Sequence, residues 1–226
     1  MIFTCRYCTK QFQRERSLDV HLCEPKRRHL EQHERGVQLG YQSYLKFYEM
    51  TQGSAKLKTV DDFISSQYYK AFVKFGRYCV DIRVVNTTQF LDWLLKNNKK
   101  IDNWCKDSVY EEYLLWWLPK EPVQDALERA LKEMEEYASN NSGLASFNHY
   151  FRYGNTNRIC HHIVSGRVSP WCIYNCSSGI EWLDTLTTEN LAIVMPYINP
   201  DIWRRKFEDY PSDTEWAKHV LREAGL

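Results

Sequence analysis

The sequence predicts a mainly α protein, in which a small ββα-like module at the N-terminus precedes a multi-helix globular domain. Apolar residues recur at helical spacing through most of residues 36–226, and sustained period-2 alternation, the pattern of half-buried strands, is missing. Cysteines and a histidine within the first 23 residues have the spacing of metal ligands. A chain of 226 residues is long enough for such a module and one further domain with its own hydrophobic core.

Four residues predict the metal site of the N-terminal module. Cys5 and Cys8 are separated by two residues, His21 follows after twelve more, and Cys23 comes just beyond. Zn²⁺ prefers thiolate and imidazole ligands in a tetrahedral arrangement, and a Cys-x2-Cys turn presents two sulfurs to one ion. We therefore expect one Zn²⁺ per chain, held by Cys5, Cys8, His21 and Cys23.

The residues between these ligands resemble a Cys2His2 zinc finger. Phe12 and Leu18 occupy the two apolar positions that form the small core of that finger. The resemblance implies a β-hairpin followed by a helix that delivers His21 to the metal.

The fourth ligand departs from the Cys2His2 pattern. No histidine stands three to five residues after His21, and Pro25 cannot donate the hydrogen bond of a continuing helix. We expect the helix to end near Leu22 or Cys23, so that Cys23 turns towards the metal. His29 is the alternative fourth ligand.

Cysteine usage and charge limit the class of protein. The chain has eight cysteines, but it shows no apolar leader after Met1 and no stretch of about 18 apolar residues, which favours a reducing cytoplasm and no membrane insertion. Net charge is +1, yet Lys and Arg dominate residues 1–30 and 56–100, whereas Asp and Glu dominate residues 101–140. Charges separated into blocks predict one surface that faces an anion.

Helical patterns follow one another along the rest of the chain. We place the boundary at Gly36, which gives residues 1–35 as a zinc finger with a basic tail and residues 36–226 as an all-helical domain. Most starts are set by capping residues, capping boxes or a proline in the first turn. The expected helices contain Tyr41 to Tyr48, Phe63 and Ile64, Phe72 and Phe75, Thr88 to Leu95, Ser108 to Trp117, Pro122 to Ala138, Asn155 to Ser165, Ser169-Pro170, Asn199 to Phe207, and Ser212 to Gly225.

Several basic residues are candidates for nucleic-acid contact. The positions of Leu18 and His21 place Arg14, Ser17 and Val20 where a finger helix reads bases, although only Arg14 is suited to grip a guanine. Cations of the finger and its tail suit phosphates, and a second basic face with interleaved aromatics runs through a later segment. These phosphate candidates are Arg6, Lys10, Arg16, Lys26, Arg27 and Arg28, and in the later segment Lys70, Lys74 and Arg77. The alternative interpretation of the later segment is that its aromatic residues belong to the core and that its cations form a solvated rim.

A looser thiol and imidazole cluster near the C-terminus is a candidate for a second metal site. It comprises Cys160, His161, His162, Cys172 and Cys176. Adjacent histidines point to different sides of a helix, so buried thiols and a core histidine explain the pattern better.

The whole chain also resembles zinc-finger proteins encoded by large tailed bacteriophages of the myovirus type, including those that infect cyanobacteria. The residues that carry this resemblance are Phe3 to Leu30 with the four ligands and Pro25-Lys26-Arg27-Arg28, then Ala71 to Gly76, and Val168 to Trp171. The resemblance implies a viral protein that works in the cytoplasm of a bacterial host on replication, recombination or transcription.

These patterns favour a nucleic-acid-binding accessory protein, with DNA and a phage or host protein as its partners. The alternative is an interaction or assembly factor whose finger docks on another polypeptide. Phosphate loops, metalloprotease and nucleophile motifs, and dinucleotide fingerprints do not occur, so we do not expect an enzyme, and a DNA-processing enzyme is the weakest of the three hypotheses.

Overall fold

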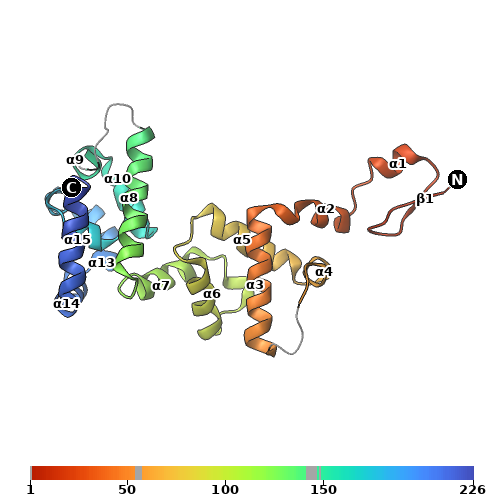
Figure 1. Cartoon of the computed structure of the whole chain (residues 1–226), viewed down its shortest axis with the longest axis horizontal. Coiled ribbons are helices and arrows are strands. Elements are labelled where there is room, and N and C mark those ends of the chain that lie inside the picture. Colours follow the sequence, from red (N-terminus) through yellow and green to blue (C-terminus); the bar gives the residue numbers. More distant parts are fainter. Residues whose placement is uncertain (1, 54–57, 141–146, 148) are drawn as a thin grey trace. The chain divides into compact units, whose positions relative to one another are not determined.

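The computed structural model describes residues 2–53, 58–140, 147 and 149–226. The chain divides into two compact units, Met1–Lys106 (unit 1) and Asp107–Leu226 (unit 2). Within the described residues the fold is mostly helical, and its strands form a single two-stranded antiparallel sheet at the N-terminus (Figure 1). The predicted mainly helical class with a small N-terminal sheet is thereby confirmed. The boundary expected at Gly36 lies inside unit 1, and the independence of residues 1–35 stays a prediction.

Unit 1 begins with the two-stranded sheet and continues as helices. Its elements are β1 (Phe3–Thr4), β2 (Gln11–Phe12), α1 (Glu15–Asp19), α2 (Glu24–Leu30), the 3-10 turn η1 (Glu31–His33), α3 (Arg35–Gln52), α4 (Val60–Ser65), α5 (Tyr69–Asp81), α6 (Thr87–Lys96) and the 3-10 turn η2 (Ile101–Asn103).

The core of unit 1 forms where α3 and α5 cross (Figure 1). The helices approach closely because Gly36 and Gly76 carry no side chain at the crossing. Beside this contact, the rings of Phe72 and Phe75 pack edge to face against Trp104, and all three side chains are buried. Buried aromatic side chains dominate the energetics of a core. Phe72 and Phe75 belong to the interior, as the alternative interpretation of that segment expects.

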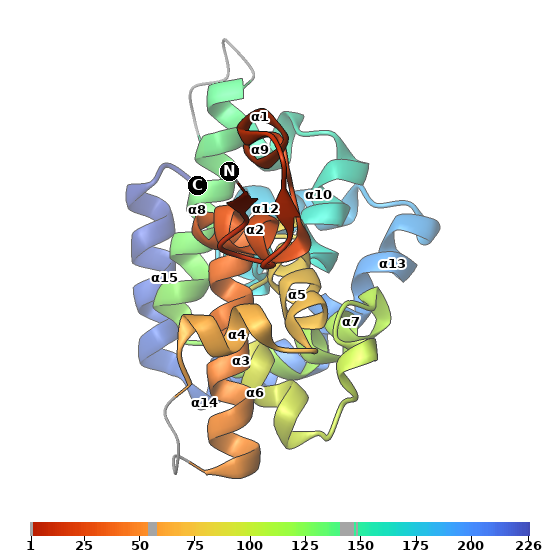
Figure 2. The ribbon, with the colours of Figure 1, turned by 90° about the vertical axis from the view of Figure 1, so that its right-hand side faces the viewer.

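Unit 2 is entirely helical within its described residues. Its elements are α7 (Asp107–Trp117), α8 (Val123–Asn140), α9 (His149–Tyr153), α10 (Thr156–Val164), α11 (Pro170–Tyr174), α12 (Ser177–Asp184), α13 (Thr188–Ile198), α14 (Pro200–Asp209) and α15 (Pro211–Glu223). Helices α8 and α15 lie side by side in both views (Figure 1, Figure 2).

A partly buried ion pair joins two corners of unit 2. The guanidinium of Arg129 on α8 donates to both carboxylate oxygens of Glu121, which is 2% exposed, and its Nε donates to the carbonyl of Gly166 at 2.7 Å. Charges this deep are tolerated when their hydrogen-bonding capacity is used, and removing one partner leaves a costly unpaired charge. The pair therefore fixes the turn before α8 against the turn after α10.

Helix starts agree with the sequence in part. Asn155, Ser169 and Asn199 are N-caps as expected, and Asp62 completes a capping box with Thr59.

Three expected starts are wrong. Asn86 rather than Thr88 caps α6, and Ser108 and Ser212 lie inside α7 and α15 instead of capping them. Helix α15 begins earlier because Pro211, with its fixed φ, occupies the first turn.

None of the helices in the described ranges combines the length and the apolar character needed to cross a bilayer.

Candidate metal centre

A β-hairpin brings the first two cysteines together. Strands β1 and β2 pair Phe3 with Phe12 and Thr4 with Gln11. In the turn between them the Cys5 N–H donates to the Lys10 carbonyl, and the Thr9 N–H donates to the Cys5 carbonyl, both at 2.9 Å. Thr9 adopts a left-handed conformation with φ 59°, which lets this short turn close. Cys5 and Cys8 thus come from one tight turn.

The other two ligands lie between α1 and α2. Helix α1 ends at Asp19 with Val20 as its C-cap, so the expectation that it continues to Leu22 or Cys23 is wrong. A second helix starts at once, with Cys23 in extended conformation as the N-cap of α2 and Pro25 in the first turn. Pro25 therefore lies in the first turn of α2 and does not end α1, and His21 lies in the connection between the two helices.

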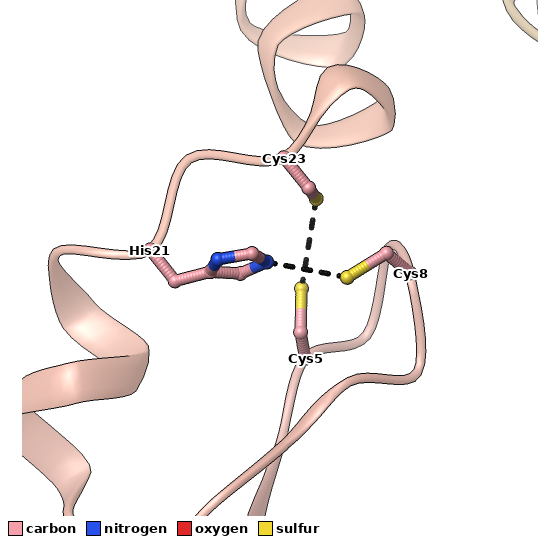
Figure 3. Close-up of side chains that lie close together, drawn as sticks. All are labelled: Cys5, Cys8, His21 and Cys23. Atoms are coloured by element: carbon pink, nitrogen blue, oxygen red, sulfur yellow. Dashed lines mark hydrogen bonds between the residues drawn. The ribbon is translucent and has the colours of Figure 1, made fainter.

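The four predicted ligands converge on a common centre (Figure 3). One ligand atom from each of Cys5, Cys8, His21 and Cys23 lies within 4.8 Å of all the others. His21 Nε2 is 3.2 Å from Cys8 Sγ, and Cys23 Sγ is 3.9 Å from Cys5 Sγ. Within the described part of the chain, no other group of three or more His, Cys, Asp or Glu side chains converges in this way. The cluster could hold one metal ion.

The electrostatics of the cluster favour a cation. Burial raises the pKa of the Cys5 thiol, but hydrogen bonds from the backbone of Tyr7 and Cys8 outweigh it and lower that pKa. The backbone of Lys10 acts to lower the pKa of Cys8, yet burial and the sulfurs of Cys23 and Cys5 raise it. Crowded sulfurs cannot all carry negative charge without compensation. Three thiolates and one imidazole are the donor set that tetrahedral Zn²⁺ takes in structural sites, so these residues fit zinc.

The alternative ligand His29 does not join the cluster. Its ring lies on α2 against the ring of Tyr7, with 5.3 Å between centroids. The Phe12 ring instead packs against His21 at 4.8 Å, and Phe12 and Leu18 are both half-buried. The contact with Phe12 helps to orient the His21 ring.

Exposed side chains surround the cluster on α1 and the hairpin. Arg14 is the N-cap residue of α1, and Ser17 and Val20 follow on exposed positions. The side chains of Arg14 and Arg16 have no hydrogen-bond or ion-pair partner among the described residues.

On the hairpin the two cations contact aromatic rings. Arg6 lies over the ring of Tyr7 and Lys10 over that of Phe12, with no carboxylate beside either within the described ranges. Arg6, Lys10, Arg14 and Arg16 therefore all keep their charge available to an anion.

The basic tail is occupied by contacts inside unit 1. Lys26 Nζ donates to the carbonyl of His21 at 3.0 Å, and Arg28 donates to the carbonyl of Ile64 at 2.7 Å while lying over the ring of Tyr69. Arg27 forms an exposed ion pair with Glu24. Of the three residues expected to form a basic tail, Arg28 anchors α2 to α4 and α5, whereas Lys26 and Arg27 contact residues nearby in the sequence.

The later basic face is neutralised in part. Arg77 pairs with Glu34 at 2.7 Å and with Glu31 at 3.1 Å, and Lys70 lies 4.0 Å from Glu24. The Glu34 hydrogen bond raises the pKa of Arg77 further. Lys74 is exposed and makes no ion pair with any described residue.

The second thiol and imidazole cluster does not assemble as a metal site. His162 is buried, hydrogen-bonds Tyr150 through Nδ1 at 2.7 Å, and places Nε2 3.3 Å from Glu133, whereas His161 is exposed. This arrangement agrees with the interpretation of a core histidine and buried thiols.

Comparison with protein-family models, with curated proteins and with solved structures finds no match to this chain.

Proposed function

We propose that this chain is a zinc-binding, nucleic-acid-binding accessory protein. One Zn²⁺ bound by Cys5, Cys8, His21 and Cys23 fixes the hairpin and α1 as a finger-like module, and this module contacts DNA. The observation that carries the proposal is the set of exposed, unneutralised cations beside the cluster: Arg6, Lys10, Arg14 and Arg16.

The charge of the two units supports this assignment. Unit 1 holds 19 Lys and Arg residues against 11 Asp and Glu residues, whereas unit 2 holds 11 against 18. A positive field attracts the phosphate backbone, and it supplies most of the affinity that does not depend on sequence. The phosphate-binding part of the chain is therefore unit 1.

The contacts of the individual cations show which of them are available to bind phosphates. Lys26, Arg28 and Arg77 already hold internal partners, so they position the module rather than contact phosphates. Arg14 and Ser17 occupy the base-reading positions of a finger helix, and Val20 offers no hydrogen bond there. We expect weak sequence preference and phosphate contacts from Arg6, Lys10 and Arg16.

A single small module buries too little surface for tight binding, about 600 to 1,000 Å². We propose that the acidic unit 2 supplies a second contact, to a phage or host protein of the replication, recombination or transcription machinery in the bacterial cytoplasm.

The alternative function, docking of the finger on another protein, also has a specific observation in its favour. Four apolar residues of the first 30, Ile2, Val20, Leu22 and Leu30, are 61 to 76% exposed. Exposed apolar surface favours protein contacts, and it contributes nothing to phosphate binding.

A salt-dependent binding assay with zinc-loaded full-length protein separates the two functions. We expect single- or double-stranded DNA to bind at low salt and to dissociate steeply as salt rises. Arg14→Ala with Arg16→Ala should weaken binding at least tenfold and reduce the salt slope. The matched control is Lys132→Ala, an exposed cation on α8 of unit 2.

The contrary result is equally clear. Equal DNA binding by wild type and the double variant at low salt would remove the nucleic-acid assignment. Ile2→Ser with Leu30→Ser, at exposed apolar positions outside the base-reading set, should leave DNA binding intact, so capture of a partner that this second variant alone abolishes would favour docking.

A further inference from the structure

A pocket of about 480 Å³ lies in unit 1 and is lined by α2, η1 and α5. Its volume is within the range of small-molecule sites. All of its lining residues belong to unit 1, and the four ligands of the metal cluster are not among them. The pocket is therefore a site separate from the metal centre.

The wall of this pocket contains a buried hydroxyl without a partner. Tyr69 is 3% exposed, its ring lies under the guanidinium of Arg28, and its hydroxyl has no hydrogen-bond partner among the described residues. Burial, and after it the carboxylate of Glu31, raise the pKa of Tyr69, so the hydroxyl stays protonated as a donor. Buried hydroxyls are nearly always paired, and a molecule bound in the pocket would supply the missing acceptor.

Two lysines on α5 give the same end of the pocket a positive charge. Lys70 Nζ lies 4.0 Å from the Glu24 carboxylate at an exposed position, and Lys74 makes no ion pair with any described residue. They are one helical turn apart and share a face. Tyr68, the N-cap residue of α5, makes no side-chain hydrogen bond to the first turn, and a helix N-terminus favours an anion. The start of α5 thus suits an anionic group.

The other end of the pocket is acidic. Glu24 and Glu31 face arginines of the same unit, but Asp81 makes no ion pair with any described residue. Asp81 lies two helical turns after Lys74, about 10 Å along α5, and the half-buried Tyr78 lines the pocket between them. The occupant should therefore carry an anion at one end and hydrogen-bond donors at the other.

From this arrangement we propose that the pocket binds a free ribonucleoside 5′-monophosphate. Its phosphate accepts hydrogen bonds from the Tyr69 hydroxyl and from the ammonium groups of Lys70 and Lys74, which are strong donors to an anion. Its ribose hydroxyls donate to the Asp81 carboxylate, and its base lies against the ring of Tyr78.

The position of Asp81 distinguishes a free nucleotide from the end of a nucleic-acid strand. In a strand, the next phosphate group replaces the free 3′-hydroxyl, and a carboxylate repels that phosphate. The site therefore goes beyond the DNA contact proposed for the finger and does not rest on it.

Isothermal titration calorimetry of the zinc-loaded full-length protein with adenosine monophosphate (AMP) tests the site. We expect one AMP per chain with a Kd below about 1 mM, and binding at least about tenfold weaker for adenosine and for inorganic phosphate, which each lack one end. Arg14→Ala with Arg16→Ala should bind AMP unchanged, because the finger surface is a separate site. In this double variant a 5′-phosphorylated oligonucleotide should not displace AMP, and displacement would overturn the assignment to a free nucleotide.

Variants of the pocket separate a binding role from a structural one. Tyr69→Phe removes only the hydroxyl, so it should weaken AMP binding about tenfold without loss of stability, since no internal hydrogen bond is broken. Lys74→Ala should weaken it similarly, whereas Lys132→Ala on α8 should have no effect.

The sugar end has its own test. The wild type should prefer AMP to 2′-deoxyadenosine monophosphate, and Asp81→Asn should reduce that preference. Circular dichroism and urea denaturation verify that each variant is folded. The proposal is overturned if the wild type does not bind AMP at about 5 mM, or if folded Tyr69→Phe and Lys74→Ala bind it as tightly as the wild type.

Discussion

Gly76 on α5 faces Gly36 on α3 so closely that a Cβ atom at position 76 would lie 2.0 Å from the Gly36 carbonyl oxygen. It would also lie 2.5 Å from the backbone nitrogen of Gly40. Both obstacles are backbone atoms, which cannot turn aside as a flexible side chain can. The packing of unit 1 therefore depends on a hydrogen atom at this position.

Gly76→Ala should destabilise unit 1 by about 3 kcal/mol, because the helices must separate and the aromatic core loses contacts. Urea denaturation followed by circular dichroism measures the change. Lys74→Ala, at an exposed position of the same helix, should change stability by no more than about 0.5 kcal/mol. Similar stabilities for the two variants would show that α3 and α5 are not packed as described.

Cys23→Ser should lose tight zinc binding, because Cys23 Sγ lies opposite Cys5 in the cluster and a serine hydroxyl is a poor zinc ligand. His29→Ala should keep one Zn²⁺ per chain, since the His29 ring lies against Tyr7. Metal analysis after dialysis against a weak chelator checks both. Zinc retained in Cys23→Ser and lost in His29→Ala would reverse the assignment of the fourth ligand.

Removal of zinc by a strong chelator should unfold the module but leave most of the helical signal. The segment that carries the ligands contains one helix of five residues, whereas the α3 and α5 core buries its aromatics without contribution from the metal. Hydrogen exchange should rise in residues 2–23 and at the start of α2 while α3, α5 and unit 2 stay protected. Loss of most ellipticity on chelation would mean that the metal site and the helices form one cooperative core.

The Cys176 thiol should make stability depend on pH. Its pKa is about 7 in the folded protein and 9.0 in the absence of interactions. Between these values the unfolded chain binds more protons, so stability rises with pH, and it falls again as pH drops through 7. We expect unfolding free energy to increase by up to about 2 kcal/mol between pH 6.5 and 8.5. Urea denaturation at both pH values, compared with Cys176→Ser, tests this, and an equal rise in the variant would assign it to other groups.

The metal cluster was predictable from sequence because its ligands lie within 19 residues, where spacing largely determines geometry. The path of the chain between these ligands was not predictable from the sequence. The sequence allows a helix to end at Val20 or at Cys23. The structure shows that α1 ends at Asp19 and that α2 begins at Glu24, with Pro25 in its first turn.

Helix starts show a similar limit. Asn86 and Thr88 are both good caps two residues apart, and burial of Val85 beside Asn86 fixes where the chain turns. The α12 cap escaped sequence reasoning because a thiol fills it, although the Cys-x3-Cys spacing before Ser-Ser-Gly was visible. The boundary at Lys106 depends on contacts between residues far apart in sequence, such as Arg28 with Ile64 inside unit 1. The residues around Lys106 carry no sequence signal of these contacts.

The anchoring of α2 has a consequence for recognition. Cys23 ends the ligand set and starts α2, and a few residues later Arg28 is gripped by Ile64 and Tyr69. The four-ligand cluster is thus followed directly by a helix that contacts α4 and α5, and not by a long linker. We expect a ligand that docks on the cluster to restrict less rotational freedom, and so to meet a smaller entropic cost, than it would on a loosely tethered module.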